Sequence, residues 1–180
     1  MKKYLIILAS IILCGCVSTK KVRNQSLEVA KFDITNFNGN YANKADSTKH
    51  SAYKELFRQL FPTTFPNKYP EKNYITENSI INLHFDNKKT LIITAIENDR
   101  ILGKIKLKGK VKGDYFSANR QLFLIPIPIF FYVHEETKII LGNDKNGGLV
   151  LKMGNYSINF IASMLSSHLY ISQSQFKKIK

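Results

Sequence analysis

Cysteine and acidic residues are scarce in this sequence, and tryptophan is absent. The 180 residues include two cysteines and 13 aspartates and glutamates against 27 lysines and arginines, which leaves a net charge of +14. The two cysteines, Cys14 and Cys16, are too few for a disulfide framework or a four-ligand zinc site. Beyond the N-terminal segment, no apolar run reaches the roughly 20 residues that a transmembrane helix needs. A disulfide-rich toxin, a polytopic membrane protein and a multi-domain enzyme are therefore excluded.

Signals for catalysis are missing as well. The sequence contains no Gly-x-Ser-x-Gly elbow and no Walker-type phosphate loop. Of its histidines, only His134 is followed directly by two carboxylates, at Glu135 and Glu136. His134 and Glu136 can share one face of a strand, but two ligands make a weak metal site. We expect a solvated turn there, no metal or cofactor, and a protein that is not an enzyme. The remaining histidines are His50, His84 and His168.

The N-terminal segment has the layout of a secretory signal. Basic residues at Lys2 and Lys3 precede the uncharged apolar run 5–13, and such an order is typical of export signals. The run ends in Leu13-Cys14-Gly15-Cys16, which resembles the lipobox of bacterial lipoproteins. The resemblance implies that residues 1–15 are a lipoprotein signal peptide and that Cys16 becomes the acylated N-terminus. Residues 16–30 would then be the lipidated end and its tether.

The residues after Cys16 bear on the location of such a lipoprotein. Val17 is not the aspartate associated with retention in the inner membrane, and the next four residues lack an acidic cluster associated with surface export. By this analogy we expect an outer-membrane lipoprotein that faces the periplasm. A strongly basic exported protein is suited to anionic lipid or an acidic envelope polymer, and not to nucleic acid.

Residues 31–180 are predicted to form one mainly β domain. From residue 79 onward, short apolar segments alternate with turn residues, and the segments 138–142 and 149–153 flank a glycine-bearing loop as in a hairpin. Strands that follow one another along the chain and are joined by short turns favour an antiparallel meander or a small curled barrel. A short first strand within 32–42 completes an order that is similar to lipocalin-like folds. That resemblance implies architecture only, and it carries no functional residues over.

One helix is predicted near residues 51–61, and the C-terminal segment is ambiguous. Apolar residues in 51–61 follow helical spacing, and Pro62 would end the helix. We expect this amphipathic helix to cover an open end or edge of the sheet. Residues 158–171 fit a helix or a strand equally well.

A strict alternation of lysine with apolar residues or glycine runs from 104 to 112. As a strand, it would place Ile105, Leu107 and Val111 on one face and the lysines on the other. The lysines are either a solvated face that blocks edge-to-edge aggregation, which we favour, or a contact surface for anionic groups. These lysines are Lys104, Lys106, Lys108, Lys110 and Lys112.

The longest apolar run of the domain spans residues 122–133. Pro126 and Pro128 exclude a central strand, so the run is an edge strand, a bulged strand or an extended loop. It is either core, which we favour, or a hydrophobic lip that contacts a bilayer or an apolar ligand. The candidate contact residues in the second case are Phe123, Ile127, Ile129, Phe130 and Phe131.

Together these features predict a lipid-anchored, non-enzymatic envelope protein in the periplasm. Its partners would be the membrane, through the acyl chains, and an apolar or anionic ligand or membrane surface. The alternative is a structural or assembly lipoprotein that docks on an outer-membrane protein complex.

The lipobox interpretation depends on the thiol of Cys16. A Cys16→Ser variant should no longer be cleaved after Gly15, because the signal peptidase of lipoproteins requires the acylated thiol. Mass spectrometry of the N-terminus and carbonate washing of membranes measure this. Unchanged cleavage and unchanged membrane retention of the variant would contradict the interpretation.

Overall fold

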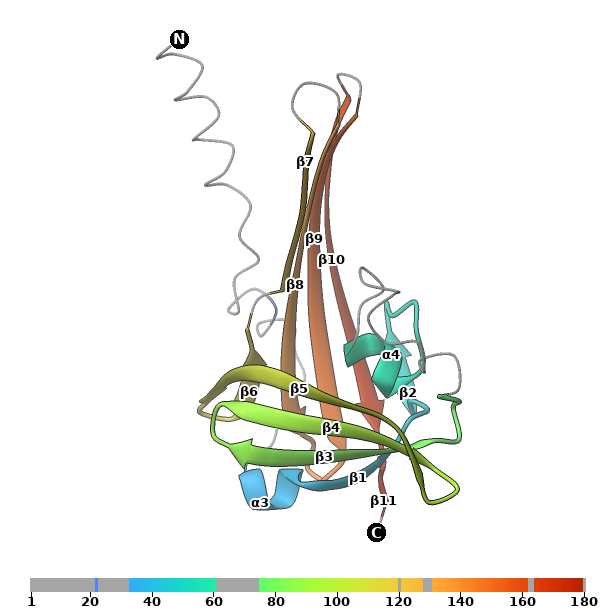
Figure 1. The fold of residues 1–180 in the computed structure, drawn as a ribbon. Coiled ribbons are helices and arrows are strands. Elements are labelled where there is room, and N and C mark those ends of the chain that lie inside the picture. The colour runs from blue at the N-terminus through green and yellow to red at the C-terminus, as the bar shows by residue number, and fades with distance from the viewer. Residues whose placement is uncertain are drawn as a thin grey trace.

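The computed structural model describes Val22 and residues 33–60, 75–119, 121–127, 131–161 and 164–179. Within these ranges the chain forms two short helices and eleven strands (Figure 1). The helices are α3 (Ile34–Phe37) and α4 (Leu56–Leu60). The strands are β1 (Gly39–Ala42), β2 (Ser47–Lys49), β3 (Ile80–Asn87), β4 (Thr90–Glu97), β5 (Arg100–Lys112), β6 (Tyr115–Ala118), β7 (Gln121–Ile127), β8 (Phe131–Asn143), β9 (Leu149–Ile161), β10 (Met164–Phe176) and β11 (Lys178–Ile179).

All of these strands belong to one antiparallel sheet. Its order is β11-β1-β3-β4-β5-β6-β8-β9-β10-β2, and β7 pairs with β8 beside this path. In the described part of the chain the two end strands, β11 and β2, do not pair with each other, so the sheet is not closed into a barrel. The predicted antiparallel meander is confirmed: β3, β4, β5 and β6 follow one another, as do β8, β9 and β10.

The core lies where the sheet folds over itself. Figure 1 shows β3, β4 and β5 crossing the lower halves of β8, β9 and β10, and residues of both sets form one buried cluster. Within this cluster the ring of Phe85 in β3 packs between those of Phe37 in α3 and Phe116 in β6. The distances between ring centroids are 5.3 Å to Phe37 and 5.1 Å to Phe116. Burial of such apolar surface is the main force that holds the two layers together. The other large core residues include Ile81, Leu83, Leu91, Ile93, Ile139, Leu141, Leu149, Leu151 and Phe176.

Strands β7 to β10 continue well beyond the core as a projecting sheet (Figure 1). We call residues 121–127, 131–137, 155–161 and 164–170 of these strands the sheet extension. At its far end Phe131 is the register partner of Ile127 on one side and of Ile161 on the other, and Ile161 in turn pairs with Met164. The β7–β8 and β9–β10 hairpins therefore end side by side.

The helix predicted over 51–61 is shorter than expected, because distant residues hold the start of that segment extended. Lys44 and Glu55 form an isolated β-bridge, and the amide of Ala45 donates to the carbonyl oxygen of Lys54 at 2.9 Å. The helix begins only at Leu56. Phe61, the last residue of the prediction, lies outside the described residues.

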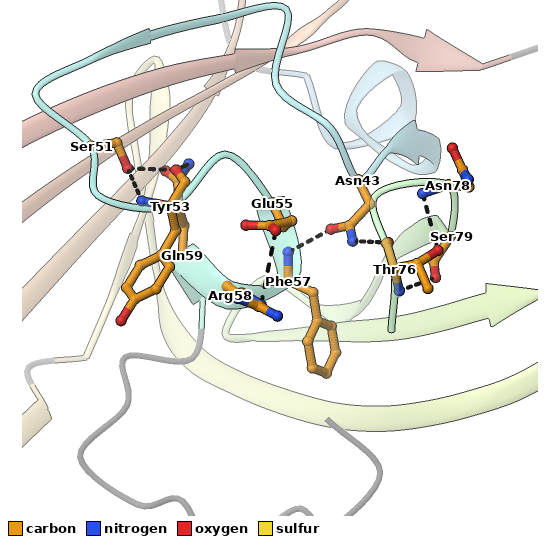
Figure 2. A network of polar contacts seen from close by, with 10 residues as sticks. All are labelled: Asn43, Ser51, Tyr53, Glu55, Phe57, Arg58, Gln59, Thr76, Asn78 and Ser79. Carbon is orange, nitrogen blue, oxygen red and sulfur yellow. Dashed lines mark hydrogen bonds and ion pairs between the residues drawn. The ribbon is translucent and has the colours of Figure 1, made fainter. Parts of the chain in front are cut away.

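Asn43 fixes the first turn of α4 (Figure 2). Its side-chain oxygen accepts from the amide of Phe57 at 2.9 Å, and its side-chain nitrogen donates to the carbonyl oxygen of Thr76 at 2.6 Å. An asparagine that accepts from a first-turn amide is the usual chemistry of a helix cap, but here it comes from outside the local sequence. The ring of Phe57 reaches within 3.7 Å of the position that a Cβ atom would take on Gly103 of β5. The helix thus covers the sheet at β5, as predicted.

The ambiguous C-terminal segment is a strand. Residues 164–176 form β10, which pairs with β9 along its whole length, from Met164 with Ile161 to Phe176 with Leu149. The glycine-bearing loop predicted between 143 and 148 does connect a hairpin, β8–β9. Its strands are longer than the predicted segments, because the pairing continues through the extension.

Tyr41 gives a stability test of the core. Its hydroxyl donates to the carbonyl oxygen of Phe37 at 2.6 Å, and burial raises its pKa from 10.0 to about 12. The folded state therefore favours the neutral phenol. That contribution is complete below pH 10 and is lost as the pH rises toward 12.

We expect Tyr41→Phe to lower the free energy of unfolding by about 1 kcal/mol at pH 8, the usual cost of one lost hydrogen bond. The difference from the unsubstituted protein should shrink between pH 10 and 12. Urea unfolding at both ends of that range measures it, and a difference that is constant with pH would contradict the assignment.

Candidate binding surfaces

The lysine-bearing strand of the sequence is β5, and its predicted faces are confirmed. Lys104, Lys106 and Lys108 are exposed, while Ile105 and Leu107 between them are buried in the core. Lys110 and Lys112 continue the exposed row. The period of two arises because successive side chains of a strand point to opposite faces.

The five lysines on the outer face of β5 form no ion pair with any carboxylate in the described part of the chain. Among the described residues, β5 has one open edge beside Lys104, Lys106 and Lys108. On one side β4 pairs with residues 100–108, whereas on the other side β6 pairs only with residues 109–112. Charges beside an open edge discourage pairing with another chain. The geometry is therefore compatible with both predicted roles, edge protection and anion contact.

Gly109 interrupts the apolar face of β5 for a steric reason. A Cβ atom at this position would lie 2.5 Å from the carbonyl oxygen of Ser117 and 2.8 Å from the Cα atom of Ala118. Only glycine allows β6 to approach so closely. The absence of a side chain in the middle of the alternating pattern thus marks the contact between β5 and β6.

The sheet extension carries a second candidate surface. Register partners across β7, β8, β9 and β10 share a face, and on one face most of the large side chains are apolar, with His134 and Glu136 of β8 lying among them. Four leucines on it are exposed, with relative exposures of 52%, 43%, 67% and 42% for Leu122, Leu124, Leu165 and Leu169. We call this surface the apolar face. It consists of Leu122, Leu124, Tyr132, Tyr156, Ile158, Phe160, Leu165 and Leu169.

The apolar run 122–133 belongs to this extension. Residues up to Ile127 form β7, which pairs only with β8 among the described strands. Of the three forms predicted for the run, an edge strand, a bulged strand and an extended loop, the first is therefore the one found for residues 122–127. The expectation that the run is core is wrong for Leu122 and Leu124, since both are exposed. The physical reason is the length of the hairpin: β7 lies in the part of the sheet that projects past the core layer of β3, β4 and β5 (Figure 1).

Not all of the candidate residues can be located. Phe123 and Ile127 lie in β7 and Phe131 begins β8, with Phe123 opposite Glu135 in the register. Ile129 and Phe130 lie outside the described residues, and so does Cys16.

His134 and Glu136 are not in a solvated turn, so that prediction is wrong. Both lie within β8, which continues for several residues on either side and pairs with β7 and β9. Glu136 is 1% exposed, and the Nδ1 atom of half-buried His134 lies 3.4 Å from the hydroxyl of Tyr132. The described residues contain no group of three or more metal-binding side chains.

At the base of the apolar face lies a small buried cluster. Val22, within the predicted tether, is fully buried and forms this cluster with Ile140 of β8, with Tyr156 and Tyr115 packed against it. Lys152, opposite Ile140 in the register, is 3% exposed, and its burial lowers the pKa of the ammonium group. Val22 therefore lies on the same side of the sheet as the exposed leucines.

Comparison with known proteins gives no assignment: the sequence matches no family model and no curated protein. None of the described helices is both long enough and apolar enough to span a membrane. The surfaces themselves are therefore the basis for a functional proposal.

The β9 and β10 half of the apolar face was missed by the analysis of the sequence. Tyr156, Ile158 and Phe160 alternate with Ser157 and Asn159, which is a strand signal. Because the residues that follow also fit helical spacing, the spacing alone did not distinguish a strand from a helix. The lack of any Asp, Glu, Lys or Arg between 153 and 170 was the stronger indication.

The anion-contact role of β5 can be tested with matched charge changes. The anion-contact role predicts that a Lys104→Gln, Lys106→Gln, Lys108→Gln variant binds isolated peptidoglycan sacculi about tenfold more weakly, since each exposed charge contributes up to about 1 kcal/mol. Co-sedimentation at low salt measures binding. The control removes the same charge from three exposed lysines on other segments, Lys49, Lys54 and Lys177. Equal losses in the two variants would leave edge protection as the role of the β5 lysines.

Proposed function

We propose that this chain is a lipid-anchored, non-enzymatic protein of the cell envelope that contacts a membrane surface with its sheet extension. Acyl chains on Cys16 would hold it at the outer membrane, facing the periplasm. The observation that carries the proposal is the apolar face, where four leucines of the extension are between 42% and 67% exposed. Large contiguous apolar surface on a folded domain marks an interaction site.

The physical argument combines an anchor with a surface contact. Acyl chains on Cys16 make a stable anchor, because two chains together hold a protein at a membrane. Complete burial of a leucine side chain contributes about 1.5–3 kcal/mol, so a half-exposed leucine has about 1 kcal/mol left to gain from contact with lipid. Several such side chains on one face supply a useful second attachment.

The lysines of β5 would make the predicted contact with an anionic group. They lie on the part of the molecule that contains the buried cluster, which we call the core domain, and not on the extension, as the positions of β5 and β7–β10 in Figure 1 indicate. The apolar and the cationic surface are thus separate, and one protein has room for a membrane contact and an anionic envelope polymer at once.

A second candidate function is assembly with an outer-membrane protein complex. It is favoured by the open edges of the extension in the described structure: β7 pairs with β8 alone, and β2 covers β10 only along residues 173–175. Exposed strand edges accept an added strand from a partner through main-chain hydrogen bonds.

Binding of the unlipidated chain to vesicles tests the membrane contact. The chain beginning at Val17 should float with phosphatidylcholine vesicles, and a Leu124→Ser, Leu165→Ser variant should lose about thirtyfold in affinity, at about 1 kcal/mol for each leucine. Flotation through a density gradient measures both.

A matched pair of single variants provides the control. Leu165 and Ile101 are 67% and 66% exposed, but Ile101 lies on β5, away from the extension. Leu165→Ser should weaken vesicle binding and Ile101→Ser should not. If neither the chain nor its variants bind vesicles, the membrane contact is refuted; recovery of one specific envelope protein by cross-linking at the extension would then favour the assembly role.

A further inference from the structure

We infer that the ends of the β7–β8 and β9–β10 hairpins insert together into the outer part of one lipid leaflet, the same leaflet that takes the acyl chains of Cys16. This inference rests on the proposed function and specifies which part of the extension enters lipid, and how deeply. It starts from the register, in which Ile127, Phe131, Ile161 and Met164 form the terminal row. Both hairpins therefore present their ends at the same height.

Charge is absent from this end of the molecule. Residues 121–133 and 153–170 contain no Asp, Glu, Lys or Arg, in a chain of which 22% is charged. The charged residues of the extension that lie nearest to its end are Glu135 and Glu136 of β8. Charged side chains are costly within a bilayer, so a segment without them is suited to insertion.

The distance from that charge to the end of the sheet fits a shallow insertion. From Glu135 to Phe131 the strand advances four residues, which is about 14 Å. An interfacial segment enters about 5–10 Å below the membrane surface. The terminal rows can therefore enter lipid while Glu135 and Glu136 stay outside it.

The second row from the end has the composition of a membrane interface. Tyr132 pairs with Phe160, and Phe160 pairs with Leu165, which is 67% exposed. Tyrosine is enriched where apolar and aqueous phases meet. On the outer side of this row, Pro126 is the partner of Tyr132 and has no amide hydrogen to leave unpaired in lipid.

The edges of β7 and β10, which are open in the part of the chain that the structure describes, set the limit of the insertion. Backbone groups without partners are costly in hydrocarbon, so an open sheet does not pass through a bilayer. The insertion is thus confined to the region where headgroups and water still reach the edges.

The anchor can reach the same height. Val22 is buried against Ile140, and Cys16 precedes Val22 by six residues, which span at most about 20 Å. From Ile140 to the terminal row at Phe131 the strand rises nine residues, or about 30 Å. The length of six residues is therefore enough for Cys16 to come within about 10 Å of that row, close to the level of Glu135.

Depth measurements on the lipidated protein test this arrangement. The processed chain has no free thiol if Cys16 is acylated, so Leu165→Cys, Leu169→Cys and Ile101→Cys each supply one site for an environment-sensitive fluorophore. Leu169 lies four residues behind Leu165 on β10, about 14 Å farther from the end. Ile101 is the control on the core domain, with an exposure equal to that of Leu165.

In phosphatidylcholine vesicles we expect a several-fold fluorescence increase and strong quenching by brominated lipid at position 165. The effect at position 169 should be weak, and none is expected at position 101. Equal quenching at 165 and 169 would show that the apolar face lies flat, which overturns tip insertion but leaves the membrane contact in place. No quenching at any site in the acylated protein would overturn the insertion, whereas the flotation of the unlipidated chain decides the proposed function separately.

Discussion

The ladder between β8 and β9 is the interaction on which the rest of the structure depends. It pairs thirteen residues of each strand without a break, from Asn143 with Leu149 to Phe131 with Ile161. The half near the hairpin loop contributes Leu141 and Leu151 to the core. The other half projects from it, so the same hydrogen-bonded ladder that is fixed by burial at one end carries the extension at the other.

The core domain and the extension differ in the chemistry of their surfaces. The core domain carries most of the charge, including the lysines on the outer face of β5, where alternation keeps the cations in water and the apolar partners in the core. The extension exposes leucine and aromatic side chains and has little charge. A folded domain keeps such a surface only at the risk of aggregation, which makes an interaction with lipid or with a partner its most direct physical explanation.

Several elements were predictable because their signals are local. The lysine alternation of 104–112 identified a strand and both of its faces, and the prolines of 122–133 excluded a central strand. Other predictions failed where distant residues decide. The helix begins at Leu56 because Asn43 and the Lys44–Glu55 bridge hold the preceding residues, and no pattern within 51–61 reports those contacts. His134 and Glu136 were assigned to a turn because the sequence alone does not show that β8 continues between β7 and β9.

The sequence by itself determined the class of the domain, its antiparallel connectivity and the inward and outward faces of β5. These follow from side-chain period and turn residues, which act over a few positions. The lipobox resemblance is likewise a property of the sequence alone. Only the tertiary structure decided that Leu122 and Leu124 are exposed, because burial depends on whether another layer covers a strand. The layer formed by β3, β4 and β5 ends below the extension, and so the same apolar composition that builds the core lower down forms a surface above it.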